Sequence, residues 1–198
     1  MIKKINFYNL LLISLIVFNS DFAIAQSQNN TTKNNTKFQF QSFSFKEGET
    51  ISNSQVFKGF GCSGENKSPQ LIWKNAPLET KSFAITAYDP DAPTGSGWWH
   101  WSVVNIPATY SQLPVNFGAQ YKPELQEGIL QIKNDYGTYA FGGPCPPQGD
   151  KAHRYIFTIY ALKVHKLELP KDPSPALVGF TINQNMITKT QTIGKYSR

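Results

Sequence analysis

The chain has 198 residues, of which 40% are hydrophobic and 14% aromatic. This is enough for one well-buried domain and too little for two ordinary ones. The formal net charge of +6 is spread along the chain and the only arginines are Arg154 and Arg198, so the basic face that nucleic-acid binding needs is not expected.

Residues 1–25 have the pattern of a secretory signal peptide. Lys3 and Lys4 form a basic start, residues 10–18 an apolar run, and residues 23–25 a small-x-small motif, so cleavage is expected after the last of these. A membrane anchor is the alternative, but the apolar run is shorter than the about 20 residues that a span needs. We therefore expect a periplasmic or secreted protein with no transmembrane segment in its mature chain.

Residues 26–37 form a polar tract without an apolar side chain. Such a tract cannot bury enough surface to offset the entropy lost on ordering, so it predicts a flexible leader. The folded domain is expected to span residues 38–198.

Short segments with strand character follow the leader. They lie at residues 38–45, 55–57, 71–73, 82–88, 101–106, 129–132, 138–141, 155–162 and 190–196. Glycine, proline, asparagine or aspartate separates most of them, and no long segment of helical period precedes residue 174, which favours an all-β, antiparallel β-sandwich over an α/β fold. Residues 108–127 lack periodicity and predict either a functional loop or a packed meander.

One short C-terminal helix is predicted after residue 173. Ser174 and Pro175 are typical of an N-cap followed by the first helical position. A partial apolar face follows, made of Leu177, Val178, Phe180, Ile182 and Met186.

The stretch from Tyr88 to Trp101 combines a stiff acidic loop with aromatic residues. Asp89 and Asp91 alternate with prolines, which restrict the backbone and position both carboxylates. A Gly/Ser turn follows, and His100 begins the next apolar run among three tryptophans. An ordinary turn is the alternative. However, exposing three indoles and an imidazole to water is unfavourable, so we expect these side chains to line a pocket.

A second loop, residues 141–155, repeats this design. Two glycines allow a close backbone approach, three prolines stiffen the loop, and His153 enters the next strand. Alone, His153 would be read as an ordinary structural histidine, but two such loops together predict a binding site.

These motifs resemble the phosphatidylethanolamine-binding protein family, in its bacterial Raf-kinase-inhibitor-like branch. The resemblance rests on Asp-Pro-Asp-Ala-Pro (89–93), Gly-Trp-Trp-His (97–100), Gly-Gly-Pro-Cys-Pro-Pro (142–147) and His-Arg-Tyr (153–155), and extends over about residues 38–198 with Asn66-x-Ser-Pro. It implies a β-sandwich with a short C-terminal helix and a small pocket for phosphate-like groups, such as a phospholipid head group. The implied pocket residues are Asp89, Asp91, Pro93, His100, Gly143, Pro146, Pro147, His153 and Tyr155.

Two carboxylates beside an anion would repel it unless one is protonated or both accept hydrogen bonds. We favour the second arrangement: Asp89 orients an imidazole, that of His100, whose other ring N–H then faces the ligand. On this hypothesis, protonation of His100 and His153 strengthens binding as the pH falls below about 6.5.

The two cysteines, Cys62 and Cys145, predict a disulfide that braces the pocket wall, because paired cysteines are usual in exported proteins. Two unrelated buried thiols are the alternative.

The leading hypothesis is an exported, non-enzymatic protein that binds a small anionic or phosphorylated ligand without a cofactor. One alternative is an inhibitor of a protease, a kinase or a host factor, with residues 118–121 as a candidate surface. Another is a hydrolase in which Asp89 and a histidine activate water, although no nucleophile motif is present. No familiar metal-ligand spacing occurs, so no metal site is expected.

Overall fold

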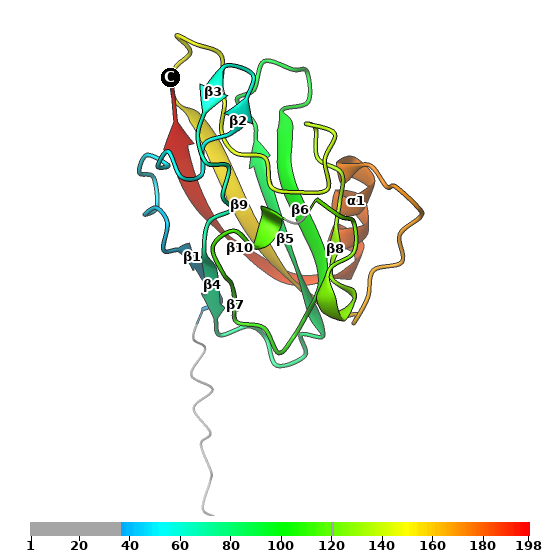
Figure 1. Ribbon diagram of the computed structural model, residues 1–198. Helices are drawn as coiled ribbons and strands as arrows, with labels where there is room; N and C mark the ends of the chain where they lie inside the picture. The colour runs from blue at the N-terminus through cyan, green and yellow to red at the C-terminus, as the bar shows by residue number, and fades with distance from the viewer. Residues whose placement is uncertain (1–36, 120) are drawn as a thin grey trace, which may run out of the picture. The chain divides into compact units, whose positions relative to one another are not determined.

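The computed structural model describes residues 37–119 and 121–198 of the chain (Figure 1). The expected signal peptide, residues 1–25, and residues 26–36 of the expected leader lie outside the described residues. Within the described part, no helix has the length and apolar character needed to cross a membrane.

The larger sheet has five antiparallel strands in the order β10-β9-β5-β6-β8. Its strands are β5 (Ser82–Asp89), β6 (Trp98–Pro107), β8 (Leu130–Gln131), β9 (His153–Leu162) and β10 (Met186–Tyr196). Strand β5 lies between β6 and β9 and is buried along nearly its whole length, as expected for a central strand covered on both faces.

A smaller sheet of three antiparallel strands, in the order β1-β4-β7, covers one face of the larger sheet. Its strands are β1 (Gln39–Ser42), β4 (Leu71–Lys74) and β7 (Gln112–Leu113). A separate two-stranded hairpin is formed by β2 (Lys58–Gly59) and β3 (Cys62–Ser63). The antiparallel β-sandwich expected from the sequence is confirmed.

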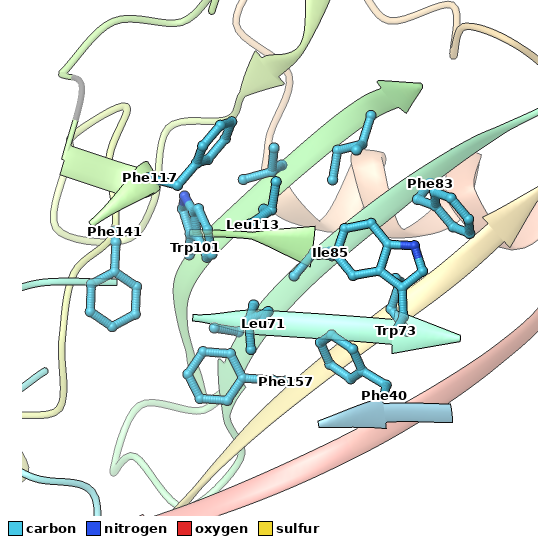
Figure 2. Close-up of a cluster of buried hydrophobic side chains, with 14 of the residues drawn as sticks. Phe40, Leu71, Trp73, Phe83, Ile85, Trp101, Leu113, Phe117, Phe141 and Phe157 are labelled. Carbon is cyan, nitrogen blue, oxygen red and sulfur yellow. The ribbon is translucent and has the colours of Figure 1, made fainter. Parts of the chain in front are cut away.

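The main hydrophobic core lies between the five-stranded and the three-stranded sheet (Figure 2). Phe40 and Trp73 reach into it from the three-stranded sheet, and Ile85, Trp101 and Phe157 from the five-stranded sheet. Full burial of a large apolar side chain contributes about 1.5–3 kcal/mol, so this layer holds the two sheets together.

Helix α1 (Pro175–Asn185) packs against the other face of the five-stranded sheet. The predicted cap is confirmed: Ser174 Oγ accepts a hydrogen bond from the backbone N–H of Leu177 at 3.2 Å. Within the helix only Val178 and Ile182 are buried, and their spacing of four residues puts them on one face.

The predicted apolar face of α1 is therefore wider than the observed one. Leu177 and Phe180 are exposed, at 39% and 59% of their surface, and Met186 already belongs to β10. Because β10 follows the helix without a loop, the last strand begins at Met186 rather than at residue 190.

Two predicted strands are wrong. Residues 55–57 form no strand: Gln55 ends a turn, and the backbone of Phe57 bonds to Pro144 and Gly64. Residues 138–141 are also irregular. The side chain of Asn134 accepts from the Thr138 N–H at 3.0 Å and donates to the Ala140 carbonyl at 2.8 Å, which takes the place of a strand partner.

Other predicted strands have different bounds. The first is shorter than residues 38–45 and the one at 129–132 shrinks to two residues, whereas β6 and β9 begin earlier than expected, at Trp98 and His153.

The segment 108–119 and 121–127 is a packed meander rather than a free loop. It contains β7 and two turns of 3₁₀ helix, Phe117–Ala119 and Gln126–Gly128. Ser68 anchors it, because its carbonyl accepts from Asn116 N–H at 2.8 Å and its Oγ accepts from Gly118 N–H at 2.9 Å.

Candidate functional site

The candidate site lies at one end of the strands of the five-stranded sheet, where β5 ends and β6 and β9 begin. Asp89 is the last residue of β5, Trp98 the first of β6 and His153 the first of β9. Because β5 is antiparallel to both neighbours, its carboxyl end meets their amino ends. The two loops singled out from the sequence therefore deliver their side chains to one place.

These side chains line one cavity of about 170 Å³. A cavity of about 150 Å³ is large enough for a benzene-sized molecule, so this one suits a phosphate-sized or small head group. Seven of the nine predicted site residues line it: Asp89, Pro93, His100, Pro146, Pro147, His153 and Tyr155. The other lining residues are Phe60, Ala92, Thr94, Trp98, Tyr136 and Cys145.

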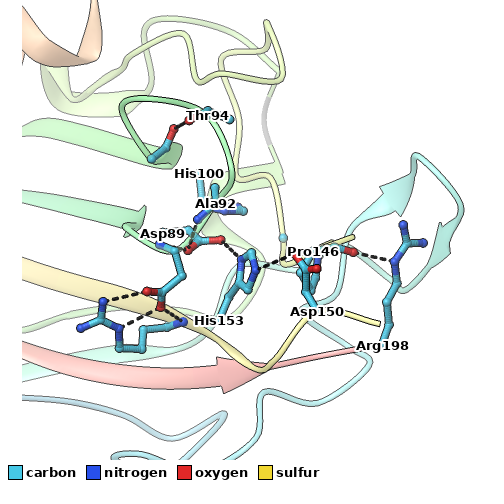
Figure 3. Close-up of polar contacts among 12 residues, drawn as sticks. Asp89, Ala92, Thr94, His100, Pro146, Asp150, His153 and Arg198 are labelled. Carbon is cyan, nitrogen blue, oxygen red and sulfur yellow. Dashed lines mark hydrogen bonds and ion pairs between the residues drawn. The ribbon is translucent and has the colours of Figure 1, made fainter. Parts of the chain in front are cut away.

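Asp89 is the hydrogen-bonding centre of the site (Figure 3). Its Oδ1 accepts from the backbone N–H groups of Asp91, at 2.8 Å, and Ala92, at 3.1 Å. Its Oδ2 lies 2.8 Å from Nδ1 of His153, and both side chains are almost fully buried. The other ring nitrogen of His153, Nε2, faces Asp150 Oδ2 at 3.4 Å. A buried imidazole is thus held between two carboxylates.

The predicted partner of Asp89 is therefore wrong: Asp89 orients His153, not His100. The ring of His100 is held by the backbone, because its Nδ1 lies 2.7 Å from the carbonyl oxygen of Gly142. A carbonyl can only accept, so Nδ1 of His100 carries the proton.

His100 is nearly completely buried, and its Nε2 has no hydrogen-bond partner among the described residues. Burial lowers the pKa of His100, outweighing the carbonyl of Gly142 and the carboxylate of Asp89, which act in the opposite direction. The ring is neutral near pH 7 and presents a lone pair at Nε2. In the neutral ring the predicted N–H donor is therefore absent from Nε2, and burial moves the protonation of His100 to a lower pH than expected.

A local irregularity in β6 brings His100 to the cavity. The pairing with β5 shifts between Ala87, which faces Trp101, and Tyr88, which faces Trp99, so His100 is the extra residue of a β-bulge. Bulges re-aim side chains beside functional sites. Here the bulge lets Trp98 line the cavity on the same side of the sheet on which Trp101 enters the core.

Only one of the three neighbouring tryptophans lines the pocket, contrary to expectation. Trp98 is in the cavity wall, whereas Trp99 packs on Tyr88 with ring centroids 4.6 Å apart. Trp101 is fully buried in the core and its Nε1 donates to Gln131 Oε1 at 2.8 Å.

Two predicted site residues do not line the cavity. Asp91 forms a two-pronged ion pair with Arg154, at 2.8 Å for both contacts. The Arg154 guanidinium lowers the pKa of Asp91 to about 2, so Asp91 is ionised near neutral pH. The ion pair therefore ties the loop after β5 to Arg154 on β9.

Gly143 supports the wall from behind. Its N–H donates to Asn66 Oδ1 at 2.7 Å, and its carbonyl accepts from the Tyr136 hydroxyl at 3.0 Å. A Cβ at Gly143 would lie 1.8 Å from the backbone oxygen of Gln55, so only glycine fits.

The predicted disulfide is present between Cys62 and Cys145. It ties the β2-β3 hairpin to the proline-rich loop and brings Phe60 to the cavity. From the chain end, Arg198 Nε donates to the Pro146 carbonyl at 2.6 Å.

Sequence reasoning missed two members of the aromatic wall formed by Phe60, Trp98 and Tyr136, since only Trp98 was expected to line a pocket. Tyr136 lies at its centre, 5.7 Å from the Phe60 ring and 5.2 Å from the Trp98 ring between centroids. Trp98 carried a signal, since it stands beside His100 in an aromatic cluster. Phe60 and Tyr136 carried none, because they come from irregular loops that meet only in the folded chain.

A β-sandwich with a small, partly apolar cavity at the strand ends, containing a few converging polar groups, has the features of a small-ligand binding protein. Residues 41–197 match the family described as Phosphatidylethanolamine-binding protein. The chain belongs to the phosphatidylethanolamine-binding protein family, and its relatives place it in the bacterial branch.

The chain is 52% identical over 159 residues to the UPF0098 protein YbcL of Escherichia coli K12, covering 80% of this chain and 87% of that protein. It is 41% identical over 152 residues to UPF0098 protein YbhB of the same organism, covering 77% and 95%. The crystal structure of E. coli YbcL, described as a new member of the mammalian PEBP family, matches with a TM-score of 0.78 and 51% identity, over 81% of this chain and 98% of that one. None of these family names states a catalysed reaction.

Proposed function

We propose that the protein is an exported, non-enzymatic binding protein that holds a small phosphoryl or similar oxyanion group, such as a phospholipid head group, in the cavity beside Asp89. The observation that carries this proposal is the set of polar atoms around that cavity that have no partner among the described residues. They are Trp98 Nε1, His100 Nε2 and Tyr155 Oη.

Three such buried atoms on residues that line one cavity are costly, because each buried polar group without a partner costs about 1–3 kcal/mol. A ligand that bonded to them would recover much of this cost on binding. The size of the cavity limits the bound part to a small group.

Export is supported by the N-terminal sequence pattern and by the disulfide between Cys62 and Cys145, since disulfides persist in oxidising compartments. We place the protein in the periplasm or outside the cell on these grounds.

A hydrolase is the second candidate, because Asp89 and His153 form the close pair that a general base requires. The geometry weighs against it. The Nε2 of His153, which would have to take the proton from water, already faces Asp150, and Cys145 Sγ is bound in the disulfide.

The test is calorimetric titration of the purified protein with inorganic phosphate and with O-phosphoethanolamine, with Tyr155→Phe as the variant. Loss of one hydrogen bond should weaken binding by about tenfold, while folding stability stays the same or rises because an unpaired hydroxyl is removed. Tyr160→Phe is the matched control, because Tyr160 lies on the same strand and packs in the cluster on the opposite face. Absence of binding at millimolar ligand, or equal binding by Tyr155→Phe and wild type, would contradict the proposal.

A further inference from the structure

The charged groups around the cavity do not favour a bare anion. None of the described residues that line it is a lysine or an arginine, and the one carboxylate among them is that of Asp89. The guanidinium of Arg154 is bound to Asp91. A phosphoryl group in the cavity would therefore meet a carboxylate of like charge. A ligand that brings its own positive charge offsets this repulsion.

Asp89 is already engaged and cannot turn toward such a ligand. Its Oδ1 accepts from two backbone N–H groups, and its Oδ2 lies 2.8 Å from Nδ1 of His153. The side chain is only 4% exposed. A partner for a cationic group of the ligand must therefore be sought beside the cavity.

A second carboxylate, that of Asp150, is held loosely beside the cavity wall (Figure 3). Among the described residues its side chain has one contact, Nε2 of His153 at 3.4 Å, and it is 42% exposed. Its backbone N–H donates to the carbonyl of Pro147 at 3.3 Å. His153 and Pro147 both line the cavity, so Asp150 contacts the wall while its carboxylate remains open to water.

An alkylammonium group suits this carboxylate. Such a group is a cation that only donates hydrogen bonds, and its bonds to a carboxylate are about twice as strong as those between neutral groups. In O-phosphoethanolamine a short carbon arm joins the ammonium to the phosphoryl group. A phosphoryl group in the cavity would therefore leave the ammonium within a short distance of the wall that Asp150 contacts.

We propose, on the basis of the proposed function, that Asp150 binds the ammonium group of the ligand and makes the pocket selective for phosphoryl compounds that carry one. The phosphoryl group occupies the cavity, and the ammonium donates to the Asp150 carboxylate. The negative charge of Asp150 opposes a phosphoryl ligand that has no ammonium. Asp150 thus distinguishes a zwitterionic head group from a plain phosphate ester.

The first experiment compares O-phosphoethanolamine with ethyl phosphate, which has the same carbon arm without the ammonium, by calorimetry at pH 7. Wild-type protein should bind O-phosphoethanolamine at least about threefold more tightly, as expected for a partly exposed ion pair. In Asp150→Asn this ratio should fall toward one, because the carboxylate is lost. Asp150→Glu keeps the charge and should keep the preference. An unchanged ratio in Asp150→Asn would overturn the inference.

The matched control is Asp172→Asn, which removes a similarly exposed carboxylate from another part of the surface. Asp172 is 51% exposed and contacts Lys133 and Tyr139, neither of which lines the cavity. Its replacement changes the net charge of the protein as much as Asp150→Asn does, and the ratio should stay at the wild-type value. An equal fall of the ratio in both variants would assign the preference to overall charge and overturn the inference.

A second pair of ligands identifies the source of the head group. Glycerophosphoethanolamine and glycerophosphoglycerol are water-soluble phosphodiesters with and without an ammonium. The same preference in this pair would support a phospholipid head group as the ligand. A preference confined to the monoesters would support a free amino-phosphate, and equal binding within both pairs would overturn the inference.

A third measurement needs no variant. In carboxyl ¹³C spectra of wild-type protein, the Asp150 signal should move more with O-phosphoethanolamine than with ethyl phosphate, and the Asp172 signal should move with neither. Equal movement of the Asp150 signal with both ligands would contradict the inference. If the wild-type protein binds both monoesters equally, the inference fails and the proposed function stands; if it binds neither, the proposed function fails and the inference fails with it.

Discussion

The role of Asp89 as the hydrogen-bonding centre of the site can be tested by comparing Asp89→Ala with Asp89→Asn. Alanine removes the partner of three donors: the N–H groups of Asp91 and Ala92 and the ring nitrogen of His153. The ring is almost fully buried, whereas the two loop residues are partly exposed and water can replace part of their bonds. With about 1–3 kcal/mol for a buried donor left unpaired and less for each loop amide, the expected loss is about 3 kcal/mol.

Asparagine keeps the shape and one oxygen. That oxygen can continue to accept from the two loop amides, and the NH₂ group can donate to Nδ1 of His153 if the ring moves its proton to Nε2, beside Asp150. The expected loss for Asp89→Asn is therefore only about 1 kcal/mol. A domain of this size loses about 2–4 °C in Tm for each kcal/mol, so the two variants should be clearly separated.

Urea denaturation followed by tryptophan fluorescence measures both losses. The control is Asp150→Ala, which removes a carboxylate from the opposite side of the same imidazole. That carboxylate is 42% exposed and 3.4 Å away, so its loss should cost less than about 1 kcal/mol. The reasoning would be refuted if Asp89→Ala cost no more than the control, or if Asp89→Asn were as damaging as Asp89→Ala.

Two further predictions concern the scaffold of the cavity. Reduction of the Cys62–Cys145 bridge, which joins residues 83 apart, should lower the free energy of unfolding by about 4 kcal/mol; urea midpoints with and without reductant measure this, and a loss below about 1 kcal/mol would exclude the bridge as a brace. Arg154→Gln should raise the pKa of Asp91 from about 2 toward 3.8 in a carboxyl ¹³C titration, an unchanged value being the contrary result. Because the folded-state pKa of Asp91 is lowered, the stabilisation by this pair should be complete above about pH 4 and lost as the pH falls toward 2.

The parts of the fold that follow from local chemistry could be predicted from the sequence. Ser174 and Pro175 form a helix start through contacts within one turn, and the apolar run of β5 needs only its own side chains to be recognised as a buried strand. The predicted strand at residues 138–141 fails for the opposite reason. Its backbone groups bond to the side chain of Asn134, a choice that alternation of apolar residues does not reveal.

The candidate site shows the same division. Prolines and glycines marked both loops, because stiff corners and close backbone approaches leave a clear signature in composition. Two members of the aromatic wall left none: Phe60 reaches the cavity through the hairpin that the Cys62–Cys145 bridge holds in place, and Tyr136 is fixed by its bond to the carbonyl of Gly143. Such contacts exist only after distant segments have met.

The partner of Asp89 could not have been chosen from the sequence, because the strand pairing offers two nearly equivalent histidines. Asp89 faces Trp98 on β6, and continuing the β5–β9 register by one residue places it opposite Tyr155. His100 and His153 are each two residues from these positions, and diagonal neighbours at such spacing lie within reach of long side chains. Two features break this symmetry. The bulge in β6 shifts the register at His100, and the Gly142 carbonyl accepts from Nδ1 of His100, so Asp89 bonds to His153 instead. The same asymmetry gives the two rings different partners: His153 lies between the carboxylates of Asp89 and Asp150, and His100 is held by the carbonyl of Gly142.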